Sequence, residues 1–162
     1  MDTKEYKIRY EVKISDIEDV AEIIKSTDFF RIDEVDVAVE LVKERLDKGV
    51  ESGYEFIFIE KDEKAIAYSC FGSIPCSLIS WDLYWIATHQ NYRNSGLGKI
   101  VLTETENQIR KLGGKAMYIE TSSKEKYLPT QKFYEKNNCE LKICFDDFYD
   151  IGDGKLVYVK KL

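Results

Sequence analysis

Two glycines and two cations lie close together in residues 93–99, which read Arg-Asn-Ser-Gly-Leu-Gly-Lys. An apolar stretch precedes this segment and a helical pattern follows it, so we predict a strand, a turn and the start of a helix. The first turn of a helix has main-chain N–H groups without intrahelical partners, and the helix dipole adds partial positive charge there. Gly96 and Gly98 have no Cβ, which lets an anion approach the main chain. The segment therefore predicts a phosphate-binding site.

Two common phosphate-binding motifs do not fit this segment. A Walker loop requires Gly-x-x-x-x-Gly-Lys-Ser/Thr, but this chain has Arg93 at the first glycine and Ile100 at the hydroxyl position. A dinucleotide-binding fingerprint requires a third glycine, where this chain has Val101. Residues 93–98 instead match Arg/Gln-x-x-Gly-x-Gly/Ala, a pattern that resembles the signature of the GNAT superfamily of N-acetyltransferases.

The composition excludes several other classes of protein. The 162 residues, 44% of them hydrophobic, predict one folded domain over residues 1–162. The formal net charge of −6 gives no general attraction to nucleic acids or anionic membranes, so we expect small or cationic partners instead. The single histidine and the absence of Cys-x-x-Cys spacing predict no metal site and four reduced thiols. The chain shows neither an apolar run of membrane-spanning length nor a signal peptide, and we expect a cytoplasmic protein.

Hydrophobic periodicity predicts strands and helices along the whole chain. The expected strands are 6–14, 54–59, 65–71, 81–87, 115–121, 140–149 and 155–162, and the expected helices are 15–27, 33–48, 97–112 and 129–137. Ser15 and Glu18 predict a capping box at the start of the first helix. In the strand 6–14, apolar and charged residues alternate, so we expect its charged side chains to face water. Leu112 is expected on the buried stripe of the third helix.

This order of elements resembles the GNAT fold over nearly the whole chain. Residues 131–137, Gln-Lys-Phe-Tyr-Glu-Lys-Asn, also resemble a segment of many members. The resemblance implies an α/β fold with a mixed central sheet of about six to seven strands flanked by about four helices. It also implies acetyl-CoA as co-substrate. Main-chain groups of Ile86, Ala87 and Thr88, together with Ser123, are the candidates for the pantetheine arm. The candidates for the pyrophosphate are Arg93, Asn94, Ser95, Gly96, Leu97, Gly98 and Lys99.

The resemblance further implies transfer of an acetyl group to a primary amine by direct attack. Such an amine, with a pKa of about 10.4, must lose a proton before it attacks. Asp82 lies eleven residues before Arg93, where histone-acetylating members carry a glutamate base, and Glu120 is the second candidate. Tyr134 matches the family tyrosine near the thioester sulfur, which would protonate the leaving thiolate. The residues alone leave alternatives open: Tyr134 as a core residue, Asp82 as the end of a strand, and Glu120 as the partner of a lysine.

In this fold the acceptor pocket comes from the early helices and the last strands. The candidates are Phe29, Phe30, Glu34, Tyr84, Phe148 and Tyr149. The pair Phe29-Phe30 is equally expected to fill the core. We therefore predict an N-acetyltransferase acting on a small molecule or a peptide, and the alternative is a non-catalytic acyl-CoA-binding sensor or interaction module. Dimers are common in the family, so a homodimer is among the expected assemblies.

Overall fold

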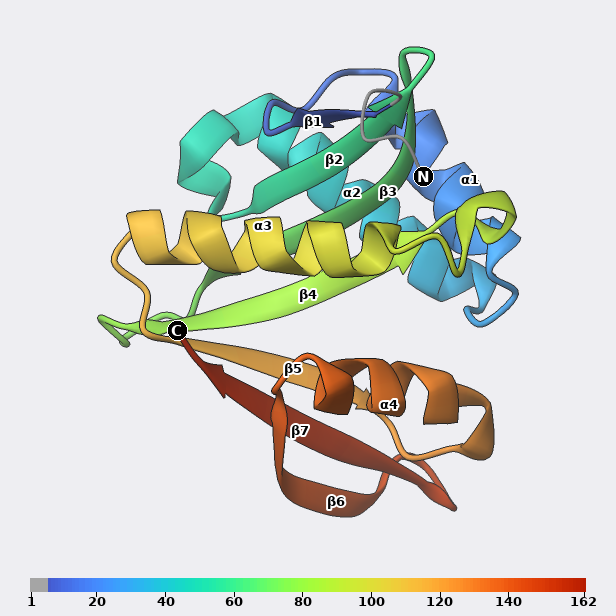
Figure 1. Cartoon of the computed structure of the whole chain (residues 1–162), viewed down its shortest axis with the longest axis vertical. Coiled ribbons are helices and arrows are strands. Elements are labelled where there is room, and N and C mark those ends of the chain that lie inside the picture. Colours follow the sequence, from blue (N-terminus) through green and yellow to red (C-terminus); the bar gives the residue numbers. More distant parts are fainter. Residues whose placement is uncertain (1–5) are drawn as a thin grey trace. The chain divides into compact units, whose positions relative to one another are not determined.

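The computed structural model describes residues 6–162 (Figure 1). Its strands make one mixed sheet in the order β1-β2-β3-β4-β5-β7-β6. The strands are β1 (Lys7–Arg9), β2 (Glu55–Lys61), β3 (Lys64–Ser73), β4 (Ser80–Thr88), β5 (Ala116–Ser122), β6 (Glu140–Asp150) and β7 (Asp153–Lys161). The α-helices are α1 (Asp16–Ser26), α2 (Ile32–Lys48), α3 (Leu97–Lys111) and α4 (Leu128–Lys136), with 3-10 turns η1 (Gly49–Ser52), η2 (Gln90–Tyr92) and η3 (Glu125–Tyr127). The expected α/β fold with a mixed central sheet is confirmed.

The backbone divides into two compact units. The first comprises Met1–Gly72 and Trp85–Gln108, and the second comprises Ser73–Tyr84 and Ile109–Leu162. The single domain expected from the chain length stays a prediction. In the part of the chain that the structure describes, no helix is both long enough and apolar enough to cross a membrane.

The core of the first unit lies between α1, α2 and the antiparallel strands β2 and β3. The helices contribute aliphatic side chains and the strands contribute aromatic rings. The buried members include Val20, Ile23, Ile24, Val35, Val42, Phe56, Phe58 and Tyr68. Gly49, with a φ of 61°, ends α2, because glycine adopts this conformation without a steric penalty. These elements form a fixed support for the segment that follows β4.

The N-terminal strand differs from the prediction. It is only three residues long, and Arg9 at its end is buried, with 6% of its side chain exposed, rather than facing water. Arg9 donates hydrogen bonds to Asp16 Oδ1 at 2.7 Å and to Glu60 Oε1 at 2.6 Å. Asp16 also accepts a hydrogen bond from the main-chain N–H of Lys13 at 2.6 Å. Ser15 lies at the N-cap without a side-chain hydrogen bond, so the predicted capping box is wrong. The Asp16 carboxylate fixes this turn instead.

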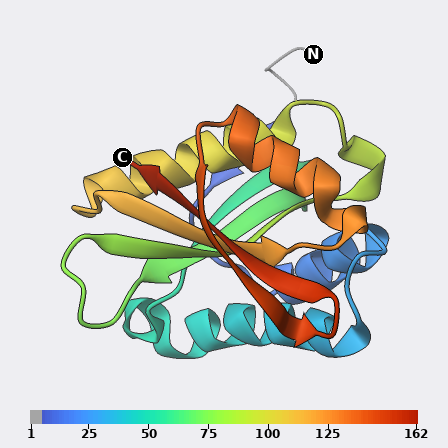
Figure 2. The same ribbon diagram turned by 90° about the horizontal axis from the view of Figure 1, so that it is seen from below.

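The second unit is built on the strands β5, β6 and β7, which follow α3 in the chain, and on the first part of β4. β4 and β5 run parallel, β5 and β7 pair antiparallel, and β6 and β7 form a hairpin. Tyr134 of α4 contacts Tyr158 of β7 with ring centroids 5.7 Å apart, and Figure 2 shows α4 beside β5 and β7. Leu112 was predicted to be buried but is 53% exposed, because α3 ends one residue earlier.

Side chains alternate between the two faces of this part of the sheet. Met117 and Ile119 of β5 are buried, as are Leu156 and Tyr158 of β7. By the same alternation Asp82, Tyr118, Glu120, Val157 and Lys155 share the opposite face, because their strands are in register. Charged residues of three strands therefore meet on one face of the second unit.

Candidate functional site

The turn between η2 and α3 leaves its main-chain donors unpaired. The N–H of Tyr92 donates to His89 O at 2.8 Å, and the N–H of Arg93 donates to Gln90 O at 3.4 Å. The next N–H along the chain that donates to a main-chain oxygen is that of Ile100, which donates to Gly96 O. Within the described chain, the N–H groups of residues 94–99 therefore donate no hydrogen bond to protein groups. Such a row of donors at a helix N-terminus is suited to an anion with several oxygens.

Local conformation keeps this row of donors open. Gly96 has a φ of 84°, which favours glycine, and a Cβ there would meet no atom within 4 Å. Asn94 also has a positive φ, of 60°, and asparagine tolerates this region better than most residues. Leu97 and Val101 are buried against Ile59, Ile66 and Ala67, so packing holds the start of α3 in place. The turn therefore has unpaired main-chain donors beside a packed helix start.

Arg93 and Lys99, the two cations of this segment, are exposed. Arg93 donates to Gln90 Oε1 at 3.1 Å, and its guanidinium lies 5.4 Å from the centre of the Phe29 ring. Phe29 thereby holds one cation beside the turn, a role that differs from its expected place at the acceptor or in the core. Spacing in the sequence gives no signal for this contact, because the two residues lie on segments far apart in the chain.

Two other acceptor candidates of the first unit have structural contacts. Phe30 packs against the core with its ring 5.1 Å from that of Trp85, edge to face. The sequence left two alternatives for Phe30, the acceptor pocket and the core, and the structure shows Phe30 packed against the core. Glu34 accepts a hydrogen bond from the main-chain N–H of Arg31 at 2.8 Å, which caps the start of α2.

The ladder between β4 and β5 is short. It joins residues 80–83 to residues 116–119, although β4 continues to Thr88 and β5 to Ser122. Ile86, Ala87 and Thr88 lie beyond the last pair of this ladder. On the edge of β4 that faces β5, the main-chain groups of these three residues therefore form no ladder hydrogen bonds with β5. The family resemblance implies such unpaired groups for residues that contact an extended ligand.

Asp82 and Glu120, the two candidate bases, lie on the face of the second unit that also carries Lys155. Lys155 Nζ is 3.3 Å from Glu120 Oε1, which confirms the alternative that Glu120 pairs with a lysine. The Glu120 side chain is still 54% exposed. Burial raises the pKa of Asp82, the charge of Glu120 raises it further, and the charge of Lys155 lowers it. Asp82 is therefore a stronger base than an ordinary aspartate.

Tyr134 is buried, with 4% of its surface exposed. Its ring contacts those of Phe133, at 5.6 Å between centroids, and Tyr158, at 5.7 Å. Burial raises the pKa of the Tyr134 hydroxyl well above its ordinary value, so the group keeps its proton at neutral pH. A protonated phenol suits a proton donor, and the ring contacts show that Tyr134 also fills the core as the alternative expected.

The remaining candidates lie near the end of β5, on β4 and in the β6–β7 hairpin. Ser123 is bound to Gly154 twice: its N–H donates to Gly154 O at 2.9 Å, and its Oγ accepts from Gly154 N at 2.8 Å. Phe148 and Tyr149 are exposed and contact each other edge to face at 5.0 Å. Tyr84 is also exposed. Exposed aromatic rings of this kind are available to contact an acceptor.

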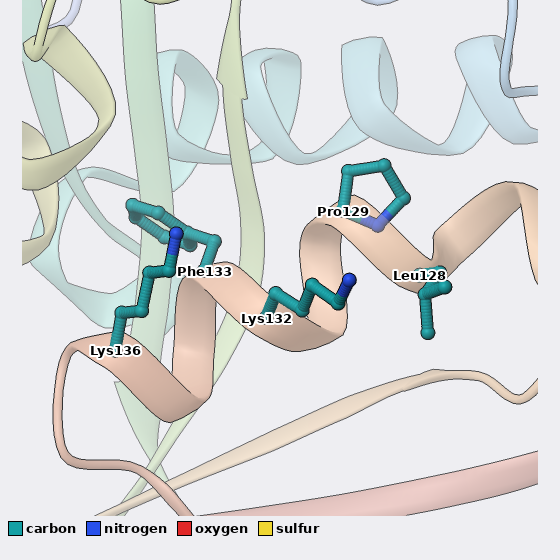
Figure 3. A pocket seen from close by; sticks show the side chains of 5 residues that line it. All are labelled: Leu128, Pro129, Lys132, Phe133 and Lys136. Atoms are coloured by element: carbon teal, nitrogen blue, oxygen red, sulfur yellow. The ribbon is translucent and has the colours of Figure 1, made fainter.

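One side of α4 carries a basic pocket that was not predicted from the sequence. The cavity has a volume of about 380 Å³ and is lined by Leu128, Pro129, Lys132, Phe133 and Lys136. Figure 3 shows the Lys136 side chain beside the Phe133 ring and the Lys132 side chain extending toward Pro129. The spacing of the two lysines, four residues apart, was the available signal, because such residues share a helix face. Apolar walls with two ammonium groups suit an anion that has an apolar part.

The His, Cys, Asp and Glu side chains of the described residues were compared with the requirements of a metal site. Among residues 6–162, no group of three or more His, Cys, Asp or Glu side chains is placed to hold a metal ion. Cys70 and Cys139 are buried, Cys76 and Cys144 are exposed, and none of these four described residues forms a disulfide.

A family comparison covers most of the chain. The model of the Acetyltransferase (GNAT) family matches residues 17–138, which include β4, the turn and α3. The chain belongs to the GNAT acetyltransferase family. A crystal structure from Desulfovibrio desulfuricans, described as an acetyltransferase of the GNAT family, is 37% identical with a TM-score of 0.95, over 96% of this chain and 98% of that one.

More distant GNAT relatives extend the comparison. The PaiA N-acetyltransferase from Thermoplasma acidophilum, solved in complex with coenzyme A, shares the fold at a TM-score of 0.74 and 18% identity, over 97% of this chain and 99% of that one. An amino-acid acetyltransferase from Yersinia enterocolitica is 27% identical over 109 residues, or 67% of this chain. The chain spans 23% of the length of that relative.

Proposed function

We propose that this GNAT family member is an acetyl-CoA-dependent N-acetyltransferase that acetylates a primary amine of a small molecule or peptide. The observation that carries the proposal is the row of unpaired main-chain N–H groups at residues 94–99. A protein that did not bind an anion there would leave these donors to water alone. The relatives solved with coenzyme A support this identity for the ligand.

Acetyl-CoA would be held through its diphosphate and its pantetheine arm. The N–H groups of residues 94–99 would bind the diphosphate, with Arg93 and Lys99 adding positive charge. Main-chain groups of Ile86–Thr88, beyond the β4–β5 ladder, would bind the amide groups of the pantetheine arm. The Ser123 hydroxyl still has a hydrogen to donate and is a further candidate for that arm.

The reaction we propose is direct attack in a ternary complex. The acceptor ammonium first loses a proton to Asp82, whose raised pKa favours the transfer; Glu120 is the second candidate. The neutral nitrogen attacks the acetyl carbonyl carbon, the N–C bond forms, the C–S bond breaks, and the nitrogen releases its second proton to solvent, from which Tyr134 regains the proton that it gives to the thiolate. The departing thiolate, with a reference pKa of about 8.5 for a thiol, takes up a proton or a strong hydrogen bond from Tyr134.

The acceptor is a primary amine because the second unit offers carboxylates beside exposed aromatic rings. Tyr84, Phe148 and Tyr149 are the exposed aromatic residues of that unit. The amino-acid acetyltransferases that match part of the chain make free amino acids one acceptor class to test.

A thiol-release assay tests the proposal. The protein is mixed with acetyl-CoA and a panel of polyamines, aminoglycosides, amino acids and peptides, and free thiol is measured over time. Tyr134→Phe should lower kcat by about 10²-fold, a magnitude typical of a lost general acid. The matched control is Tyr158→Phe, which removes a hydroxyl from the neighbouring ring, where it donates to Glu135 Oε1 at 3.2 Å.

Two results would contradict parts of this proposal. Equal kcat values for the Tyr134→Phe variant and the wild type would remove Tyr134 from the mechanism. Calorimetric binding of acetyl-CoA without thiol release for any amine would favour the non-catalytic acyl-CoA-binding module instead.

A further inference from the structure

Lys155 of β7 occupies a cage that the protein builds from acidic and aromatic side chains. Its Nζ lies 3.3 Å from Glu120 Oε1, 3.9 Å from the centre of the Phe148 ring and 5.6 Å from that of Phe145. Only 15% of the Lys155 side chain is exposed, so its ammonium is partly withdrawn from water. A carboxylate together with aromatic faces is the set of groups that binds an ammonium ion. The protein has thus placed one of its own cations in surroundings that suit an amine.

The charges on this face do not cancel. Asp82 of β4, Glu120 of β5 and Lys155 of β7 share the face, and the charges of both Glu120 and Lys155 act on Asp82. Two carboxylates and one ammonium leave one net negative charge. An acceptor with one ammonium group balances that charge, whereas the second ammonium of a diamine would be repelled by Lys155.

We propose that Lys155 determines the specificity of the acceptor site, limiting it to amines that carry one positive charge. The inference rests on the proposed function, because it takes Asp82 and Glu120 as groups that face the acceptor. Lys155 would act through charge and through the position that it gives to Glu120, without contacting the thioester. The lowering effect of its charge on the pKa of Asp82 agrees with this role, since that effect keeps the base ionised.

The test compares butylamine with 1,4-diaminobutane as acceptors for the full chain. The wild type is compared with Lys155→Met, which keeps an apolar stem, and Lys155→Arg, which keeps the charge. Lys142→Met is the matched control, because Lys142 lies on the adjacent strand β6 and pairs with Glu140 at 2.8 Å on the surface. The measured quantity is the ratio of kcat/KM for the diamine to that for the monoamine.

We expect the ratio to rise about tenfold in Lys155→Met, because a unit charge close to the acceptor is removed and solvent screening moderates its effect. The ratio should stay near the wild-type value in Lys155→Arg and Lys142→Met. A variant that had merely lost packing would slow both acceptors alike and leave the ratio unchanged. An unchanged ratio in Lys155→Met would overturn the proposal.

A binding measurement separates this proposal from the proposed function. Aspartate and glutamate side-chain carboxyls are labelled with ¹³C, and their NMR shifts are followed during titration with each amine, without acetyl-CoA. If no thiol is released by the wild type, the proposed function fails, but the shifts of Asp82 and Glu120 still report binding. Preferential binding of the diamine in Lys155→Met, relative to the wild type, supports the role of Lys155. If the ¹³C shifts of Asp82 and Glu120 do not change with either amine in the wild type or in any variant, the proposed role of Lys155 is overturned.

Discussion

Replacement of Gly96 by aspartate tests the phosphate turn most directly. Gly96 is exposed and has a φ of 84°, and a Cβ added there would have no atom within 4 Å, so aspartate meets no steric obstacle from neighbouring groups. The new carboxylate would lie beside the N–H groups that we expect to bind the diphosphate. Two unit charges about 5 Å apart at an effective dielectric constant near 20 repel each other by about 3 kcal/mol. That energy corresponds to a loss of about 10²-fold in affinity for coenzyme A.

The same substitution at Gly53 separates this electrostatic effect from backbone strain. Gly53 has a φ of 78° and is likewise free of atoms within 4 Å, but it lies between η1 and β2. A residue with a Cβ in this conformation costs about 1–2 kcal/mol, somewhat less for aspartate, at either position. Thermal unfolding should therefore shift by a few degrees, about 2–4 °C per kcal/mol, in both variants.

Isothermal titration calorimetry with coenzyme A provides the assay for both variants. We expect Gly53→Asp to bind as the wild type does and Gly96→Asp to bind about 10²-fold more weakly. The effect should shrink at high ionic strength, because salt screens exposed charges. Equal affinities of the two variants would refute the assignment of the diphosphate to residues 94–99.

Further substitutions probe the base and the buried ion pairs. Asp82→Asn should remove the acidic limb of the kcat/KM pH profile. In the wild type we expect this limb above the ordinary pH range of an aspartate, because burial raises the pKa of Asp82. An acidic limb that persists in the variant would exclude Asp82 as the base. Since a raised folded-state pKa gives stability that is lost as pH rises through it, Asp82→Asn should also be more stable than the wild type at pH 7 in urea unfolding. Arg9→Met should lower the free energy of unfolding by about 3–5 kcal/mol, because the buried carboxylate of Asp16 loses its paired cation and Glu60 is left with Lys13, whose Nζ lies 2.8 Å from Glu60 Oε1. The control Arg31→Met, at an exposed pair, should cost less than about 1 kcal/mol, and similar costs for both arginines would argue against the buried network.

Local patterns in the sequence were enough to predict most of the secondary structure. Hydrophobic periodicity predicted α2 over 33–48 and the strands 54–59 and 65–71, which the structure shows as the antiparallel pair β2 and β3. The strand-turn-helix arrangement around Gly96 was also predictable, because the glycine spacing, the preceding strand and the following helix are all encoded within residues 82–112. These features depend on neighbours in the chain, which a single sequence displays.

The sequence could not show which charged side chains meet. Arg9 reads as a surface residue of a strand, but its partner Glu60 is 51 positions away, and the ion pair offsets the free-energy cost of burying both groups. Glu34 was expected near an acceptor, whereas its carboxylate caps α2. In both cases the sequence displays the charge but not the group that neutralises it.

The amino-acid sequence by itself determined the order of strands and helices and the turn before α3, and its resemblance to the GNAT family supplied the candidate acid and bases. Only the tertiary structure decided that Lys155 lies against Glu120, 35 positions earlier, and within reach of the charge on Asp82. The physical reason is that sheet register, set by the packing of whole strands, determines which side chains share a face. The turn at residues 93–99 is formed by contiguous residues, whereas the charge of the proposed acceptor site depends on residues of three strands, β4, β5 and β7.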